Sequence, residues 1–137
     1  MHVRVGRPIP ESGVQIVRAA HGEFRVADLE RSRAFYVDVL GFHETERTAH
    51  ALYLRGLEER DHHSLVLRLA DPPGAGHLGF RVVSDDDLDR MARFAKQQGL
   101  ATRWVADGEE PGQGRSLRVQ DPFGLPLEFV AEVDQVE

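Results

Sequence analysis

The feature of this sequence that most constrains its fold is an internal repeat. The segment HGEFRV begins at His21 and the segment HLGFRV begins at His77, so that histidine, phenylalanine, arginine and valine recur at matched positions. In each copy a residue that can cap a helix, Asp28 or Ser84, follows seven residues after the histidine. Repetition with a constant order of elements is the signature of a duplicated supersecondary unit. The chain is therefore predicted to contain two copies of one unit.

Each copy predicts the same order of elements: a strand, a helix and three further strands. Apolar residues alternate along the strands, and each helix begins at a capping residue and ends at a glycine. We expect an irregular arm over 1–15 and a single domain over 16–137, with module one at about 16–70 and module two at about 77–132. The predicted strands are 17–26, 42–47, 50–55, 63–69, 77–83, 102–106, 115–120 and 126–131, and the predicted helices run from Asp28 to Gly41 and from Ser84 to Gly99.

The composition limits the partners and the chemistry that are available. A length of 137 residues suits one domain, and a net charge of −6 without a basic stripe argues against nucleic acid or an anionic membrane as a partner. The sequence shows no apolar run long enough to span a bilayer and no secretory leader, so the cytoplasm is the expected location. Because the chain has no cysteine, any metal must be held by nitrogen and oxygen.

Two histidines and one glutamate form the candidate metal site. His21 and His77 open the first strand of their modules, so a pseudo-twofold arrangement would place both side chains on one face of a shared sheet. Glu128 lies between apolar residues of the last strand, where an unpaired carboxylate is costly to bury. Two imidazoles and one carboxylate with open positions are typical of non-haem Fe(II) oxygenases, and Mn(II) is also suited. The alternative is that Glu128 forms a salt bridge with Arg25 or Arg81.

Three segments resemble the vicinal oxygen chelate superfamily, which contains glyoxalase I, bleomycin-resistance proteins and type I extradiol dioxygenases. They are VADLERSRAFYVDVLGF, HLGFRV and DPFGLPLEF, and the resemblance covers residues 17–131. It implies an α+β fold in which paired βαβββ modules form an incompletely closed barrel around a cavity, with the helices outside. It also implies metal ligands in the first strand of one module and in the first and last strands of the other, the positions of His21, His77 and Glu128.

A closer resemblance is to the N-terminal domain of homoprotocatechuate (3,4-dihydroxyphenylacetate) 2,3-dioxygenases, through DLERSRAFYVDVLGF, YLRGLEERDHHSLVL and LRVQDPFGLPLEF. It implies ring cleavage of a small aromatic diol, a catechol such as 3,4-dihydroxyphenylacetate, by O2, with Fe(II) or Mn(II) as the cofactor. In this family an acid/base histidine precedes the second histidine ligand by about the interval that separates His62 from His77. His62 is therefore the predicted catalytic acid/base.

Two other functions stay open at this point. The N-terminal domain of those two-domain enzymes is usually the metal-free copy, so the first alternative is a metal-free domain that supports assembly or binds a small molecule without turnover. The second is a glyoxalase-like isomerase, but such sites favour a further acidic ligand from the last strand of module one, and residues 64–69 contain no acid. Unpaired sheet edges predict a homodimer or a higher oligomer.

Overall fold

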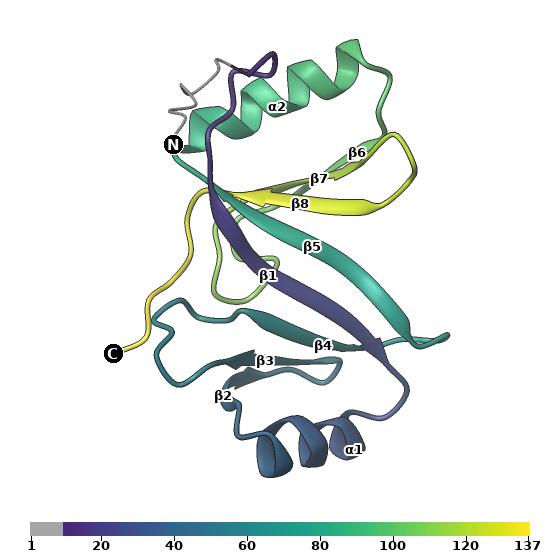
Figure 1. Ribbon diagram of the computed structural model, residues 1–137, viewed down its shortest axis with the longest axis vertical. Coiled ribbons are helices and arrows are strands. Elements are labelled where there is room, and N and C mark those ends of the chain that lie inside the picture. The colour runs from purple at the N-terminus through teal and green to yellow at the C-terminus, as the bar shows by residue number, and fades with distance from the viewer. Residues whose placement is uncertain (1–9) are drawn as a thin grey trace, which may run out of the picture.

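The computed structural model describes residues 10–137, so residues 1–9 of the predicted arm lie outside the described residues. Eight strands form one sheet in the order β2-β3-β4-β1-β5-β8-β7-β6 (Figure 1). The strands are β1 (Ile16–Val26), β2 (His43–Arg47), β3 (Ala51–Arg55), β4 (Leu65–Leu69), β5 (Gly74–Val82), β6 (Thr102–Val105), β7 (Ser116–Gln120) and β8 (Pro126–Val130).

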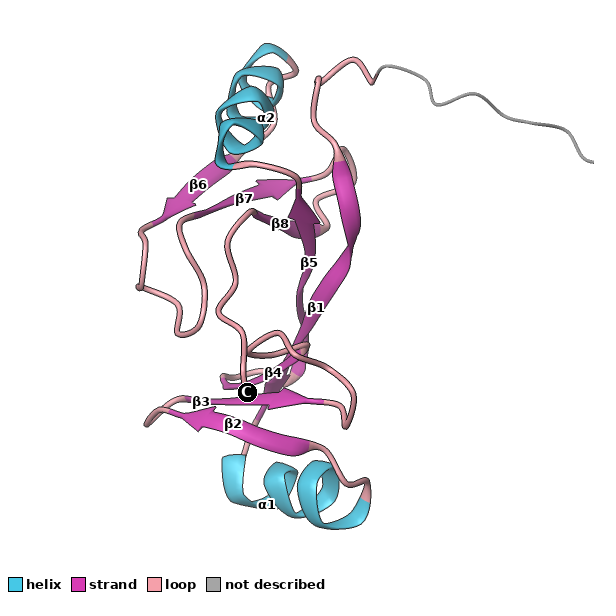
Figure 2. Ribbon diagram, turned by 90° about the vertical axis from the view of Figure 1, so that its left-hand side faces the viewer, coloured by secondary structure: helices cyan, strands magenta, loops and turns pink. Residues whose placement is uncertain are grey.

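The order of the strands shows the predicted duplication. Each module has its first strand beside its last in parallel, β1 beside β4 and β5 beside β8, and the two first strands pair antiparallel at the centre. The sheet curves strongly, with β1 and β5 along its back and the two outer groups of strands bending toward each other (Figure 2). The predicted α+β fold of paired modules in an incompletely closed barrel is therefore confirmed.

Each module has its own apolar core between its helix and the outer face of its strands. In module two, α2 (Asp85–Gln97) starts at Ser84, whose N–H donates to the side chain of Asp87 at 3.3 Å, as the sequence predicted. This helix packs through Leu88 and Ala95 on the strands of its module. In module one, four buried leucines of β3 and β4 pack against the first helix: Leu52, Leu54, Leu65 and Leu67. Because the apolar cores lie outside the sheet, its inner face is free for polar groups.

The first helix differs from the regular helix that the sequence predicts. It consists of α1 (Leu29–Arg33), capped by the Asp28 side chain, and a π-helical segment, η1 (Ala34–Val39). Within η1 the Leu40 N–H donates to the Phe35 carbonyl, five residues back, and this wider turn changes which side chains face the core. Tyr36 packs on the core, whereas Phe35 and Leu40, which the spacing of a regular helix would place beside it, are half exposed.

Strand β5 begins at Gly74, three residues before its predicted start. The sequence placed a chain break there because of its glycines and prolines. In the structure Gly74 and Ala75 pair with Arg25 and Phe24 of β1, so the glycine-rich segment extends the central pair of strands. Through this extension β5 pairs with β1 beyond His21 and Glu23, as far as Arg25.

Two segments cross the open side of the curved sheet. The loop 106–115 between β6 and β7 is joined to the C-terminal segment by the Gln113–Val133 bridge. That segment in turn contacts module one, where the His62 N–H donates to the Asp134 carbonyl at 2.8 Å. The loop 106–115 and the C-terminal segment therefore connect module two to module one across the open side of the sheet. Within residues 10–137, no helix is long and apolar enough to cross a membrane.

Replacing Leu88 with alanine tests the core of module two. Leu88 is fully buried, so Leu88→Ala should lower the free energy of unfolding by about 2–5 kcal/mol, because it removes buried methyl groups and leaves a cavity. The matched control is Leu57→Ala, at a side chain that is 82% exposed, which should change stability by less than about 0.5 kcal/mol. Urea unfolding followed by circular dichroism measures both, and equal losses would contradict the packing described.

Candidate metal centre

Three adjacent strands bring the predicted ligands together. His21 of β1 lies opposite Gly79 of β5, and Gly79 in turn lies beside Glu128 of β8. His77 precedes Gly79 by two residues and therefore presents its side chain to the same face. The side chains of His21, His77 and Glu128 are almost completely buried, with Glu128 at 0% exposure. Residues far apart in the sequence thus meet at the centre of the inner face.

The donor atoms of these side chains are spaced as metal ligands are. His21 Nε2 lies 2.9 Å from His77 Nε2, and Glu128 Oε1 lies 3.1 Å from His21 Nε2 and 3.5 Å from His77 Nε2. Adjacent ligands about 2.1 Å from one ion are separated by about 3.0 Å at octahedral angles and about 3.4 Å at tetrahedral angles. The two nitrogens and the oxygen therefore fit one divalent ion, and all three donors are of the nitrogen and oxygen type that the cysteine-free sequence requires.

Glu23 orients His77 from the side opposite the ion site. Glu23 Oε2 lies 3.2 Å from His77 Nδ1, and Glu23 shares a face of β1 with His21 because the two residues are two apart in the strand. A proton on Nδ1 that is donated to Glu23 leaves the lone pair of Nε2 directed at the site, the tautomer that a metal ligand needs. Carboxylates in this position fix the ring of a metal-ligating histidine. Glu23 was not among the predicted site residues.

Arg118 of β7 contacts the second oxygen of Glu128. Its Nε donates to Glu128 Oε2 at 2.8 Å, so only Oε1 is turned toward the histidines. The alternative prediction, that Glu128 forms a salt bridge with Arg25 or Arg81, was wrong, because the arginine that pairs with Glu128 is Arg118. Arg25 donates to the Asp71 carbonyl and Arg81 to the Ala131 carbonyl, so each is engaged elsewhere along its strand.

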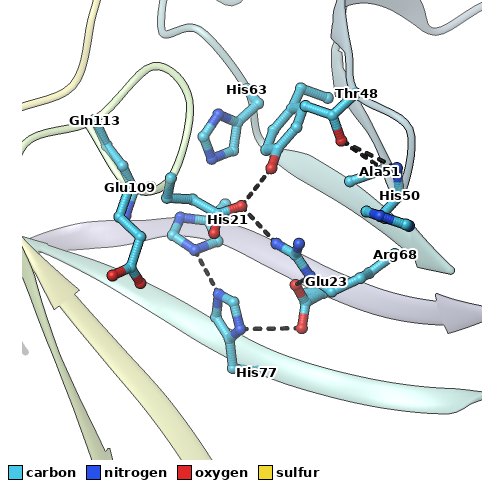
Figure 3. Close-up of polar contacts among 12 residues, drawn as sticks. His21, Glu23, Thr48, His50, Ala51, His63, Arg68, His77, Glu109 and Gln113 are labelled. Atoms are coloured by element: carbon cyan, nitrogen blue, oxygen red, sulfur yellow. Dashed lines mark hydrogen bonds and ion pairs between the residues drawn. The ribbon is translucent and has the colours of Figure 1, made fainter. Parts of the chain in front are cut away.

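A chain of charged side chains continues from Glu23 into module one, as Figure 3 shows around the labelled residues. Arg68 of β4 donates to Glu23 at 2.6 Å and also to Glu110 of the loop 106–115. Glu110 accepts a further hydrogen bond from the hydroxyl of Tyr53, which is buried in β3. The loop of module two is therefore fastened to the strands of module one by charge-assisted hydrogen bonds, which are stronger than neutral ones.

The charges of this buried cluster favour one more cation. Three carboxylates face two guanidinium groups, which leaves one formal negative charge: Glu23, Glu110 and Glu128 against Arg68 and Arg118. Without a metal, His77 supplies the missing charge. Burial alone would lower the pKa of His77, but its contacts with Glu128 and Glu23 outweigh burial and raise that pKa to about 9. A divalent ion that binds here must displace this proton.

Glycines make the room that the ligands occupy. A Cβ atom at Gly79 would lie 2.2 Å from Cε1 of His21, and one at Gly76 would lie 2.3 Å from Oε2 of Glu23. The glycines that flank His77 thus leave space for the two β1 side chains that meet it. The pattern Gly-His-x-Gly at 76–79 is a signal of this crowding in the sequence, but its cause becomes visible only when β1 lies alongside β5.

The structure places His63, rather than His62, beside the metal cluster. The ring of His63 is centred 5.2 Å from that of His21. His62 lies one step farther out, with its Nδ1 2.9 Å from His63 Nδ1 and its Nε2 2.8 Å from Glu46 Oε1. Burial, followed by the proximity of His21 and His62, lowers the pKa of His63 to about 3. The catalytic role of His62 remains a prediction, and any contact with the centre runs through His63.

Comparison with known proteins agrees with this geometry. Residues 18–129 match the Glyoxalase/Bleomycin resistance protein/Dioxygenase superfamily. The chain belongs to this superfamily. Among solved structures of homoprotocatechuate 2,3-dioxygenase, the substrate complex from Brevibacterium fuscum with 3,4-dihydroxyphenylacetate is 40% identical, and the native enzyme of Arthrobacter globiformis is 43% identical. Both superpose with a TM-score of 0.88 over 95% of this chain and 41% of the solved chain.

Further members of the superfamily are related in sequence. A metapyrocatechase of Pseudomonas sp. (strain CF600) is 36% identical over 118 residues, which cover 85% of this chain and 38% of the relative. A manganese-dependent 2,3-dihydroxybiphenyl 1,2-dioxygenase of Geobacillus genomosp. 3 is 29% identical over 121 residues, which cover 88% of this chain and 38% of the relative. The chain therefore spans less than half the length of the relatives that it matches.

A methyl group at Gly79 should disturb the centre. We expect Gly79→Ala to push the His21 ring aside and to destabilise the protein by about 1–3 kcal/mol, the usual cost of overpacking. The control is Gly22→Ala, since a Cβ at that neighbouring position of β1 has no atom within 4 Å. Urea unfolding compares the two variants. A Gly79→Ala protein as stable as Gly22→Ala would show that the contact with His21 is not as close as described.

Glu23 should support the fold in acid. Burial alone would raise the pKa of Glu23, but hydrogen bonds and charge interactions with His77 and Arg68 lower it from 4.5 to about 2. A depressed pKa contributes stability that is present above about pH 4.5 and is lost as the pH falls toward 2. We therefore expect Glu23→Gln to weaken the pH dependence of unfolding between pH 4.5 and 2, whereas the exposed control Glu58→Gln should leave it unchanged. Urea midpoints measured at each pH, with a chelator present, test this.

Proposed function

We propose that this chain is a ring-cleaving extradiol-type dioxygenase domain that acts on a catechol through a divalent metal held by His21, His77 and Glu128. The observation that carries this proposal is the convergence of His21 Nε2, His77 Nε2 and Glu128 Oε1 in a buried cluster with an excess negative charge. The relatives support the reaction class, because they are dioxygenases of dihydroxylated aromatic compounds.

The residues around the site prepare it for such a metal. Glu23 holds His77 in the tautomer that directs Nε2 at the centre, and Arg118 leaves Glu128 with one oxygen to offer. A bound Fe(II) or Mn(II) supplies the Lewis-acid and one-electron chemistry that lets a catechol react with O2. His63 lies against His21 and Tyr53 lies against His63, and both are buried, so bulk water is excluded on this side of the site.

A pair of histidines can carry protons between the site and solvent. His63 lies against His21 and is hydrogen bonded to His62, and His62 is hydrogen bonded to Glu46, whose side chain is 46% exposed. Protons of a catechol would pass through His63 to His62, since His62 itself does not face the centre; because burial lowers the pKa of His63 to about 3, His63 would relay a proton without retaining it. This places His62 in the acid/base role as the outer member of a pair.

The substrate proposed is 3,4-dihydroxyphenylacetate or a related catechol, with O2 as the second substrate. Its support is the likeness to a solved enzyme whose structure holds that compound. The cytoplasm as the location and a homodimer or higher oligomer as the assembly remain predictions. A glyoxalase-like isomerase is less well supported, since β4 (Leu65–Leu69) carries no acidic side chain and Glu23 faces Nδ1 of His77 rather than the ion site.

The second candidate is a metal-free domain that binds a small molecule or supports assembly. It is favoured by one observation, that a protonated His77 balances the charge of the cluster without a metal. The pKa of His77, raised to about 9, keeps that proton in place near neutral pH. Metal binding therefore decides between the two functions.

Metal content after anaerobic loading tests the proposal. We expect one Fe(II) or Mn(II) per chain to survive desalting, and His77→Ala to lose it, because the variant lacks one of three ligands. The control is His50→Ala, at an exposed histidine away from the centre, which should retain the metal. The loaded parent protein should then convert 3,4-dihydroxyphenylacetate into a yellow ring-opened product. A parent that holds no more metal than His77→Ala would overturn the proposal in favour of the metal-free domain.

A further inference from the structure

Among residues 10–137, Gln113 is the one neutral amide that hydrogen bonds to the metal centre. It lies on the loop 106–115, and only 4% of its surface is exposed. Its Nε2 donates to Glu128 Oε1 at 3.1 Å, which is the same oxygen that faces the two histidines. In Figure 3 the side chain of Gln113 descends from its loop toward the ring of His21. Gln113 therefore occupies the side of the centre that β1 and β5 leave open.

The amide oxygen of Gln113 has no hydrogen-bond partner among the described residues, although it is buried. A buried polar atom without a partner costs about 1–3 kcal/mol, so such atoms are rare and call for an explanation, of which a bound ion is one. The donor half of the amide is satisfied and the acceptor half is not. The amide thus carries an unused oxygen within a cluster that favours a cation.

The position of the amide matches that of a fourth ligand. Rotation of the amide by a half turn exchanges its oxygen and nitrogen and places the oxygen about where Nε2 now lies, 3.1 Å from Glu128 Oε1. That separation equals the distance from Glu128 Oε1 to His21 Nε2 and agrees with about 3.0 Å for adjacent ligands of one ion. The amide oxygen is a hard donor of the kind that Mn(II) accepts.

The loop holds Gln113 in place from both sides. Gly112 has a positive φ of 79°, and a Cβ there would lie 2.1 Å from Cγ of His62, so the backbone packs directly on module one. Glu110 is fastened to Arg68 and Tyr53, and Gln113 itself pairs with Val133 through the backbone. A side chain fixed in this way can serve as a ligand, because it is positioned before the ion arrives.

We propose that Gln113 is a fourth protein ligand of the metal, through its side-chain oxygen. The inference rests on the proposed function, because it requires that the centre binds a divalent ion. With two histidines, Glu128 and Gln113 bound, a six-coordinate ion has two remaining positions, enough for the two oxygens of one catechol.

Binding of Mn(II) to the full chain tests this proposal without turnover. Chelator-treated protein is titrated with Mn(II), free Mn(II) is followed by electron paramagnetic resonance, and water-proton relaxation reports the waters on the bound ion. Four protein ligands leave two waters and three leave three, so Gln113→Met should raise the relaxation per bound ion about 1.5-fold and weaken binding about tenfold. The matched control is Gln97→Met on the exposed face of α2, which should equal the parent.

Gln113→Glu keeps an oxygen at the same position and should retain the relaxation of the parent with tighter binding. If Gln113→Met does not fold, the relaxation of Gln113→Glu still tests whether Gln113 is a ligand. Unchanged relaxation in Gln113→Met, or a 1.5-fold rise in Gln113→Glu, would overturn the role of Gln113 while leaving the proposed function intact. A parent protein that binds no Mn(II) would overturn the proposed function first and this inference with it.

Discussion

The structure depends on one buried carboxylate, that of Glu128. An isolated carboxylate cannot be buried without strong partners, and here the partners come from three strands and one loop. His21 and His77 contact Oε1 of Glu128, and Gln113 donates a hydrogen bond to the same oxygen. Arg118 donates to Oε2. These contacts lower the pKa of Glu128 below its usual range against the effect of burial. The curved sheet is the arrangement that lets residues so distant in sequence share this group.

The pseudo-twofold arrangement of the modules explains why the site lies at the centre. The two first strands pair antiparallel, so the histidines that open the repeated segment approach each other instead of lying at opposite ends of the sheet. The apolar cores stay outside, between each helix and its own strands. The inner face can then carry charge, because the two larger apolar cores lie on the opposite face and only the small cluster of Ala51, Tyr53 and Val66 packs there.

The centre is built to exchange a proton for a metal. In the absence of an ion, the proton on His77 completes the charge balance, and Glu23 and Glu128 hold it. This balance accounts for two properties that would otherwise conflict, a site with the geometry of a metal centre and a buried cluster that is satisfied without one.

The sequence alone determined the repeat and the order of the elements through local patterns: period-two strands, helix caps and a histidine at matched positions. The candidate ligand Glu128 came from a carboxylate between apolar residues, and the fold class came from the resemblance of three segments to a known superfamily. It did not determine the π-helical segment, since Phe35 and Leu40 fit a regular helix equally well. Nor did it indicate Arg118, Arg68 or Gln113, whose roles depend on which strands and loops become neighbours. Only the tertiary structure decided that His63 faces the centre and His62 does not, because both lie in the irregular segment before β4, whose course depends on its contacts with the C-terminal segment.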